Sequence, residues 1–205
     1  MTLIKVCGIT NKIDAVNASN LGIDMLGFIF YERSKRYVDR NTVREIINEL
    51  PGSVHKAGVF VDENAEKVRQ IAEDVGLDVL QFHGNETPEY CAAFKENYKV
   101  IKAFRLRDRE DLKSVGLYDV DFYLVDTHKS GMAGGTGETF DWKILKDFEF
   151  LKPVILSGGL NPDNVGKAIS EVVPYGVDVS SGVEESSGKK SLHLLKRFVE
   201  EVRKA

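Results

Sequence analysis

The chain has 205 residues and a formal net charge of −4, with its 28 lysine and arginine residues scattered along it. Hydrophobic residues make up 42% and charged residues 29%, which is enough to bury a substantial core, so one domain over residues 1–205 is expected. The scattered basic residues argue against a nucleic-acid partner, and every apolar run is far shorter than the ~20 residues of a membrane span.

The N-terminus has no basic head, long apolar segment or small-residue cleavage site, so a cytoplasmic location and no membrane partner are expected. The two cysteines, Cys7 and Cys91, form neither a C-x-x-C motif nor a zinc-like spacing. Both are therefore expected to be free thiols.

One unit recurs along the chain: a run of β-branched and aromatic residues, a break, and a stretch with helical spacing. Eight such runs predict strands at residues 3–9, 25–30, 56–61, 79–83, 100–106, 122–126, 153–157 and 176–180. Between them, segment 64–76 predicts an amphipathic helix that ends at a glycine. Thr87-Pro88 and Asn161-Pro162 each predict an N-cap followed by proline at the first helical position.

Eight strand and helix units predict an α/β protein with a (β/α)₈ TIM barrel, a fold that occupies roughly 200 to 400 residues. The nearly continuous apolar strands fit a parallel sheet that is covered on both faces. A doubly wound open sheet is the alternative. That fold usually carries G-x-G-x-x-G after its first strand, whereas this chain has Gly8-Ile9-Thr10-Asn11 there, so the barrel is preferred.

In a barrel the active face is formed by the C-terminal ends of the strands, and the first run ends on Cys7. A cysteine at this position is either a small buried hydrophobe or a reactive group. Lys5 shares its face of the strand, and a nearby ammonium favours the thiolate, so Cys7 is a candidate base or nucleophile. Gly8 is expected to leave room for substrate beside the thiol. Cys91, in a predicted helix beside two alanines, is expected only to fill space.

The sixth run ends on Asp126, which either caps the following turn or acts as a general acid opposite Cys7. The seventh and eighth runs are followed by Gly158-Gly159 and by Ser180, Ser181 and Gly182. Loops after these two strands are where such barrels often bind phosphate through backbone N–H groups, so a phosphate site is predicted there.

Four further features stand near predicted strand ends. Arg36 is either a surface cation or a partner for a substrate carboxylate, and His83 either binds substrate or is only hydrogen-bonded at its strand end. The glycine-rich segment 128–139 matches no nucleotide-binding motif and suits a lid. Asp178 is expected to point into the barrel toward Lys5.

Taken together, these motifs resemble the phosphoribosylanthranilate isomerase family. The resemblance rests on "KVCGIT", "GFIFYERSKRYV", "GVFV", "QFHGNE", "VDTH" with "GGTGETFDW", "LSGGLNPDNV" and "VDVSSGVEESSGKK", in the family's order from residue 5 to residue 190. A double glycine alone is a weak signal, but C-G-I-T together with S-K-R-Y and D-V-S-S-G-V-E is highly specific.

The resemblance implies an Amadori rearrangement in tryptophan biosynthesis, from N-(5-phosphoribosyl)anthranilate to 1-(2-carboxyphenylamino)-1-deoxyribulose 5-phosphate. By resemblance, Cys7 is the general base, Asp126 the general acid and Arg36 the partner of the anthranilate carboxylate. The glycine and serine loops, Gly158 with Gly159 and Ser180 to Gly182, match the family's phosphate site. The substrate supplies its own electron sink, so no metal or organic cofactor is expected. The partner is thus a small sugar phosphate, and the oligomeric state is either monomer or homodimer.

Two classes of rival remain. One is another phosphate-binding barrel enzyme, either indole-glycerol-phosphate synthase, with lysine and glutamate at the strand ends, or a pentose-phosphate epimerase, with several metal-ligand histidines. The other is a barrel that binds a sugar phosphate without catalysis. Cys7 and Asp126 argue against the synthase and the noncatalytic barrel, and the epimerase is disfavoured because His83 is the only histidine that ends a strand run.

Overall fold

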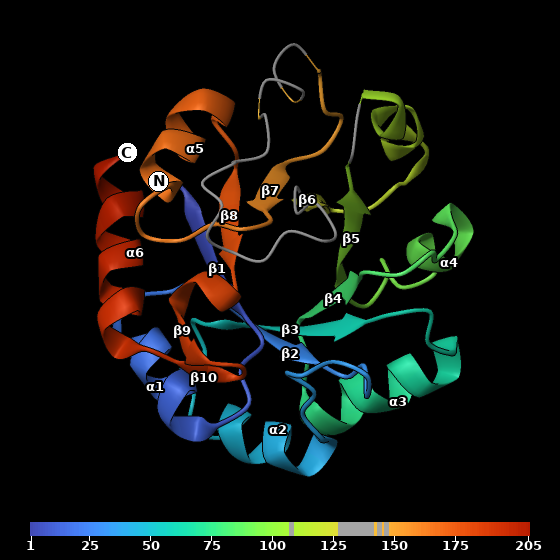
Figure 1. Ribbon diagram of the computed structural model, residues 1–205. Coiled ribbons are helices and arrows are strands. Elements are labelled where there is room, and N and C mark those ends of the chain that lie inside the picture. Colours follow the sequence, from blue (N-terminus) through green and yellow to red (C-terminus); the bar gives the residue numbers. More distant parts are fainter. Residues whose placement is uncertain (107–108, 127–141, 143–144, 146–147) are drawn as a thin grey trace.

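Eight parallel strands close into a barrel in the computed structural model of the chain (Figure 1). Each strand pairs with the next in sequence, and the ring closes where Lys5 of the first strand lies opposite Asp178 of the eighth. The structure describes residues 1–106, 109–126, 142, 145 and 148–205. The predicted barrel is confirmed, and the doubly wound open sheet is excluded.

All eight apolar runs form strands, with ends within a few residues of the predicted ones. The strands are β1 (Leu3–Cys7), β2 (Met25–Ile29), β3 (His55–Phe60), β4 (Val79–Phe82), β5 (Lys99–Arg105), β6 (Phe122–Asp126), β7 (Val154–Ser157) and β8 (Gly176–Val179). Because all eight run in the same direction, their C-terminal ends meet at one rim of the barrel.

Helices and short turns of helix surround the barrel (Figure 1). The helices are α1 (Lys12–Asn20), α2 (Arg40–Ile47), α3 (Ala65–Val75), α4 (Pro88–Ala92), α5 (Val165–Val172) and α6 (Leu192–Lys204), with 3₁₀ segments η1 (Arg109–Leu117) and η3 (Ser181–Val183). After β8 and η3 the chain forms a small antiparallel hairpin, β9 (Glu184–Ser186) and β10 (Lys189–Lys190). No helix in the described ranges is both long and apolar enough to cross a membrane.

Local signals place most helix ends. The side chain of Asn64 caps α3, and Gly76 ends it in the left-handed conformation with φ of 72°. Thr87 caps α4, which begins at Pro88 as predicted. These ends depend on contacts within one turn of the chain, which is why the sequence predicts them.

The helix predicted to begin at Asn161-Pro162 begins later, at Val165, so that prediction is wrong. The side-chain oxygen of Asn161 accepts a hydrogen bond from the backbone N–H of Asp163 at 2.8 Å, and that of Asn164 accepts from the N–H of Asn161 at 2.9 Å. The carbonyl of Asn161 also accepts from the N–H of Val165 at 3.1 Å, so the two asparagines hold a turn that leads into the regular helix.

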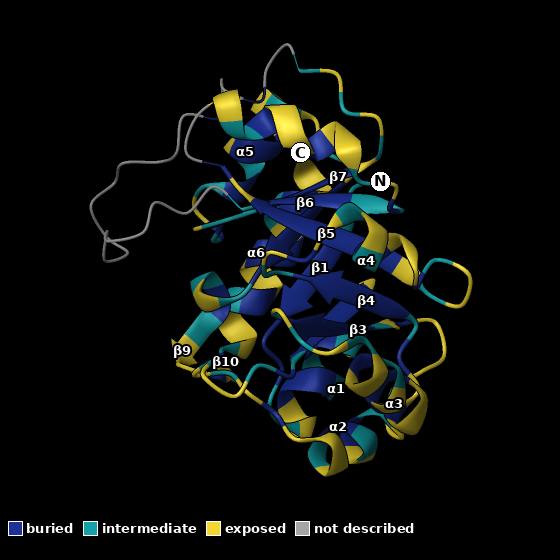
Figure 2. Ribbon diagram, turned by 90° about the vertical axis from the view of Figure 1, so that its right-hand side faces the viewer, coloured by how far each residue is buried: buried dark blue, intermediate teal, exposed yellow. Residues whose placement is uncertain are grey.

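The apolar core has two parts. Inside the barrel, a small cluster of buried side chains comprises Met25, Ala57, Val79, Ile101, Ala103, Leu124 and Ile155. A much larger cluster joins the outer face of the strands to the helices. Figure 2 shows the strands buried and the outer faces of the helices exposed. The barrel interior also holds buried polar groups, among them Lys5, Gln81 and Asp178, which lead toward the rim.

Candidate active site

Cys7 ends β1 at the rim of the barrel, and its side chain is almost fully buried. Below it, the Nζ of Lys5 donates a hydrogen bond of 2.8 Å to Asp178 Oδ1, and Ser157 donates to Oδ2 of the same carboxylate at 3.1 Å. Lys5 is completely buried, and its ammonium interacts electrostatically with Cys7. The expected contact of Asp178 with Lys5 is therefore confirmed, and both residues support the thiol.

The charges around Cys7 do not make it a thiolate in the resting protein. Burial raises the pKa of the thiol, and the Asp178 carboxylate adds to this rise. Lys5 and Lys190 lower the pKa, as their charge requires, but they do not overcome burial. Lys5 thus favours the thiolate, as expected, but the loss of water around the buried thiol outweighs its effect and the pKa of Cys7 is raised.

Two glycines shape the space around the thiol. A Cβ on Gly27 would lie 2.8 Å from Cys7 Sγ and 3.2 Å from Lys5 Nζ, so only glycine leaves room for both side chains. Gly8 has φ of +76°, and a Cβ there would lie 2.5 Å from Arg36 Cδ and 3.1 Å from Ser180 Oγ. The room beside Gly8 is thus filled by Arg36 and Ser180, where the sequence predicted substrate.

Asp126 ends β6 at the same rim, three strands away from Cys7 around the ring. His83 follows β4, and its Nε2 lies 3.5 Å from Asp126 Oδ2. The Nδ1 of His83 lies 3.0 Å from the side-chain nitrogen of Gln81, a buried residue of β4.

A buried ion pair supports the loop that carries His83. Lys102 Nζ donates at 2.8 Å to Glu86 and at 2.8 Å to the carbonyl of Gly84. Glu86 in turn accepts from the backbone N–H groups of Asp62 and Gly84. This carboxylate therefore ties the loops after β3 and β4 together and fixes the start of the segment after His83.

The glycine and serine loops after β7 and β8 lie side by side, as predicted. Together with the carboxylates of Asp126 and Asp178, the two loops line one hollow. Its lining residues are Asp126, Ser157, Gly158, Gly159, Leu160, Asp178, Ser180 and Ser181. Ser180 Oγ is buried, and no group in the described ranges hydrogen-bonds to it. Gly182 lies against the β7 loop, because a Cβ there would be 1.9 Å from the carbonyl oxygen of Leu160. The two loops thus form a polar cradle beside Asp126.

Arg36 lies in the loop after β2, and its guanidinium is held by Glu184 at the start of β9. Arg36 Nε and Nη2 donate to the two oxygens of Glu184 at 2.7 and 2.6 Å. Lys190 Nζ donates to the same carboxylate at 2.8 Å. Burial opposes ionisation of Glu184, but the hydrogen bonds from Arg36 and Lys190 outweigh it and lower the pKa of this carboxyl group.

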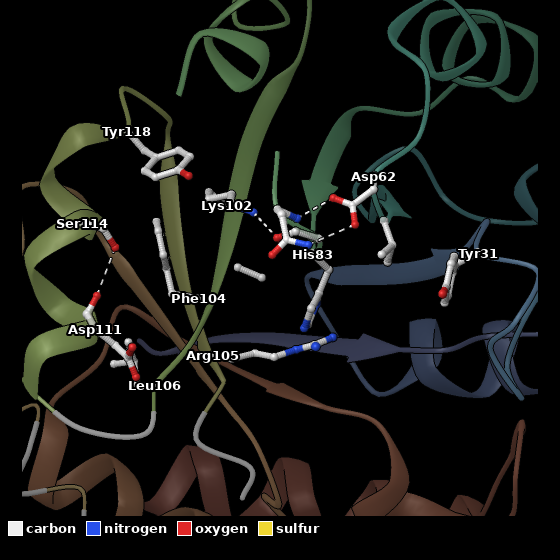
Figure 3. A pocket seen from close by; sticks show the side chains of 14 residues that line it. Tyr31, Asp62, His83, Lys102, Phe104, Arg105, Leu106, Asp111, Ser114 and Tyr118 are labelled. Atoms are coloured by element: carbon white, nitrogen blue, oxygen red, sulfur yellow. Dashed lines mark hydrogen bonds between the residues drawn. The ribbon is translucent and has the colours of Figure 1, made fainter. Parts of the chain in front are cut away.

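A second and larger hollow of about 600 Å³ opens at the rim beside β3, β4 and β5 (Figure 3). His83 and Arg105 extend toward the same part of it, and Tyr31, Asp62 and Tyr118 line its walls. Arg105 lies opposite Asp126 in the strand register. His83 and Asp126 therefore stand between this hollow and the polar cradle, and the two spaces together form the mouth of the barrel.

The structure brings all nine predicted site residues to the rim, and it adds four that the sequence did not indicate. The additions are Gln81, Glu184, Lys190 and Ser157, which contact His83, Arg36, the Cys7 carbonyl and Asp178 respectively. "VEESSGKK" did signal a polar segment after the phosphate loop, but its charges give no indication of their partners. The predicted lid, segment 128–139, lies outside the described residues.

Known proteins match this chain over its whole length. The family model described as N-(5'phosphoribosyl)anthranilate (PRA) isomerase matches residues 4–201. An N-(5'-phosphoribosyl)anthranilate isomerase of Caldanaerobacter subterraneus subsp. tengcongensis is 49% identical over 203 residues, which cover 99% of this chain and 98% of the relative.

Solved structures agree. Phosphoribosyl anthranilate isomerase from Thermotoga maritima superimposes with a TM-score of 0.93 at 40% identity, covering both chains completely. A phosphoribosyl anthranilate isomerase in complex with reduced 1-(o-carboxyphenylamino)-1-deoxyribulose 5-phosphate has a TM-score of 0.88 at 38% identity, again over the full length of both chains. With this match of sequence and fold, the chain belongs to the N-(5'-phosphoribosyl)anthranilate isomerase family.

Proposed function

We propose that this chain isomerises N-(5'-phosphoribosyl)anthranilate in tryptophan biosynthesis with Cys7 as general base and Asp126 as general acid. One observation carries the assignment of roles: a thiol and a carboxylate stand at the same rim, beside a polar cradle built from the loops after β7 and β8. Acid and base are thus within reach of one sugar whose phosphate is held in that cradle.

The chemistry requires one proton donor and one proton acceptor. Asp126 protonates the ring oxygen of the ribose, which opens the ring to a protonated Schiff base. The positive nitrogen acidifies the proton on the neighbouring carbon, and Cys7 removes that proton to leave an enolamine. The enolamine then tautomerises to the ketone. Ring opening and deprotonation each move one proton between a side chain and the substrate, and the final tautomerisation moves one proton within the substrate, from the enol hydroxyl to the carbon attached to nitrogen. The number of protons on the enzyme and substrate together therefore stays the same.

The resting ionisation of Cys7 constrains this mechanism. Burial holds Cys7 as a thiol, whereas a base must be a thiolate. A thiolate with a carboxylic acid contains the same number of protons as a thiol with a carboxylate, so moving one proton from Cys7 to Asp126 creates the reactive pair. The positive charge that develops on the substrate nitrogen and the ammonium of Lys5 both stabilise the thiolate at that moment.

The remaining residues are proposed to bind the substrate. Ser180, with its buried hydroxyl, and the backbones of Gly158, Gly159, Ser181 and Gly182 are assigned to the phosphate. Glycine at these positions lets the backbone approach the phosphate oxygens closely.

At the other end of the substrate, Arg36 is assigned to the anthranilate carboxylate, since a guanidinium binds a planar carboxylate through two parallel hydrogen bonds. His83 is assigned to a substrate contact on the β4 side, where it lines the larger hollow and faces Asp126.

The proposed location is the cytoplasm. Cys7 and Cys91 are both free thiols, which supports a reducing compartment such as the cytoplasm. Dimeric forms occur in the family, since one solved relative from Thermotoga maritima is described as dimeric and as converted to monomers. For this chain a monomer and a homodimer are both compatible with the described surface.

The test is loss of the fluorescence of N-(5'-phosphoribosyl)anthranilate on addition of purified protein. We expect Cys7→Ala and Asp126→Asn each to lower kcat by at least about a hundredfold, the low end for a lost acid or base. Cys91→Ala, at the other cysteine, is the matched control and should retain the parent rate. Activity within a few fold of the parent in either catalytic variant would remove that residue from the mechanism.

The same assay tests the second rival, a barrel without catalytic activity. A barrel that binds the sugar phosphate without catalysis would show no turnover while still binding the reduced product analogue. Turnover that disappears in both Cys7→Ala and Asp126→Asn excludes this reading, because binding alone does not depend on an acid and base pair.

A further inference from the structure

The carboxylate of Glu184 holds the guanidinium of Arg36. The Oε1 of Glu184 accepts from Arg36 Nε at 2.7 Å, and its Oε2 accepts from Nη2 at 2.6 Å. The Glu184 side chain is only 5% exposed and the Arg36 side chain 23% exposed, so water competes weakly for this contact. Arg36 is therefore fixed from one side by a buried anion.

The contact leaves a defined edge of Arg36 available. A guanidinium offers two forks of parallel N–H groups, and Glu184 occupies the one formed by Nε and Nη2. Within the described ranges no group accepts a hydrogen bond from Nη1. The second fork, formed by Nη1 and the remaining N–H of Nη2, matches the spacing of a second planar carboxylate.

Lys190 fixes Glu184 in turn. Its fully buried Nζ donates to Glu184 Oε1 at 2.8 Å, to the carbonyl of Cys7 at 2.6 Å and to the carbonyl of Ser180 at 3.2 Å. These three acceptors use all three N–H groups of the ammonium. Because Lys190 pairs with Glu184 across the β9–β10 hairpin, the hairpin sets the position of the carboxylate relative to both the base and the phosphate loop.

The charges of this cluster also match one carboxylate. Arg36 and Lys190 carry two positive charges and Glu184 one negative charge, which leaves one positive charge at the free edge of Arg36. Without Glu184, two cations would face each other across a buried space, and repulsion would turn Arg36 toward solvent. The cluster is therefore neutralised by a ligand with a single carboxylate.

We propose that Glu184, held by Lys190, is a positioning residue that presents the free edge of Arg36 to the carboxylate of the anthranilate group. The inference rests on the proposed function, in which Arg36 binds that carboxylate. It adds the means by which the chain would distinguish a substrate with the ring carboxylate from one without it.

The test compares two ligands in one variant. One ligand is reduced 1-(o-carboxyphenylamino)-1-deoxyribulose 5-phosphate, and the other is the same compound without the ring carboxylate. Calorimetry gives the Kd of each for the parent and for Glu184→Gln, which keeps the shape of the side chain and removes its charge. We expect Glu184→Gln to weaken binding of the carboxylate ligand by about tenfold and of the other ligand by less than about twofold.

A matched control and a kinetic measurement accompany the binding data. Glu185→Gln changes the adjacent residue, which is exposed and pairs with Lys189, and both Kd values should remain those of the parent. In turnover, Glu184→Gln should raise KM and leave kcat within about threefold of the parent. Glu184 is proposed to act only through the contact of Arg36 with the substrate carboxylate, and this contact is the same in the ground state and the transition state.

Equal weakening of both ligands in Glu184→Gln would show a merely structural role and overturn the proposal. Arg36→Met separates this failure from that of the proposed function: if Arg36→Met binds both ligands with the parent's preference, Arg36 does not bind the carboxylate at all. Should Glu184→Gln fail to fold, Glu184→Asp replaces it. The side chain of aspartate is shorter and cannot reach both Arg36 and Lys190. An unchanged preference of Glu184→Asp for the carboxylate ligand would again overturn the proposal.

Discussion

Replacing Lys5 with methionine tests whether the buried charges below Cys7 work as a unit. Lys5 is completely buried, and its Nζ lies 2.8 Å from Asp178 Oδ1. Methionine fills nearly the same volume without charge, so the change removes the ion pair and leaves packing largely intact. Asp178 would then remain buried, with the hydroxyl of Ser157 as its nearest side-chain hydrogen bond.

The expected cost follows from that uncompensated charge. Breaking a buried ion pair by removing one partner costs about 3–5 kcal/mol in the free energy of unfolding. Replacing both partners removes the stranded charge, so the Lys5→Met/Asp178→Asn double variant should lie within about 2 kcal/mol of the parent. The double variant is thus expected to be more stable than Lys5→Met alone.

Urea unfolding followed by circular dichroism gives the free energy of unfolding of the parent, Lys5→Met, Asp178→Asn and the double variant. A loss below about 1 kcal/mol in Lys5→Met, or additive losses in the double variant, would refute the reasoning, because both results require that the two charges be solvated independently. The same variant reports on catalysis. Lys5 is the largest influence that lowers the pKa of Cys7, so its removal should raise that pKa further and reduce turnover.

Three further outcomes are expected. Gly182→Ala should raise the Ki for inorganic phosphate by about tenfold, because a Cβ at this position meets the Leu160 carbonyl. The control Gly166→Ala, which has open space around it, should leave the Ki unchanged. Equal effects of the two substitutions would contradict the prediction. The thiolate absorbance of Cys7, taken as parent minus Cys7→Ser, should be less than half developed at pH 9, since burial raises the pKa of Cys7 above the usual 9.0. A full thiolate signal at pH 7 would exclude a resting thiol. Burial also raises the pKa of Cys91 to about 12, above its unfolded value of 9.0, so the stability that the neutral thiol contributes is complete below pH 9 and declines as pH rises toward 12. Between pH 8 and 10 the parent should therefore lose about 1.4 kcal/mol more free energy of unfolding than Cys91→Ala. Parallel curves of stability against pH for the two proteins would refute this.

Several features of the site were predictable from short stretches of sequence. An apolar run shows where a strand lies, and the first polar residue after it shows what stands at the rim. Cys7, His83 and Asp126 were found in this way. The family resemblance then supplied roles that no local pattern gives. A thiol at a strand end can simply fill space in the core, and a carboxylate there can simply cap the following turn.

Other features depend on contacts that the sequence separates widely. Arg36 and Glu184 are 148 positions apart, and Lys190 lies 183 positions from Cys7, whose carbonyl it binds. A charged residue in a hairpin is ordinarily a solvated one, so nothing in "VEESSGKK" indicated two buried charges. The sequence analysis assigned the space beside Gly8 to substrate, whereas the structure fills it with Arg36. Arg36 comes from the loop after β2, so its approach to Gly8 could not be seen from the residues around Gly8.

By itself, the sequence determined the eight strands, the fold class and the residues at each strand end, because apolar runs, capping and turn preferences act within one element. Only the tertiary structure decided which charges meet and in which ionisation state. Closure of the ring sets β8 against β1, buries Lys5 with Asp178 and carries the β9–β10 hairpin to Arg36. Burial then raises the pKa of Cys7 despite its cationic neighbours, a result that depends on the loss of water around the thiol and not on the identity of the residues beside it in the chain.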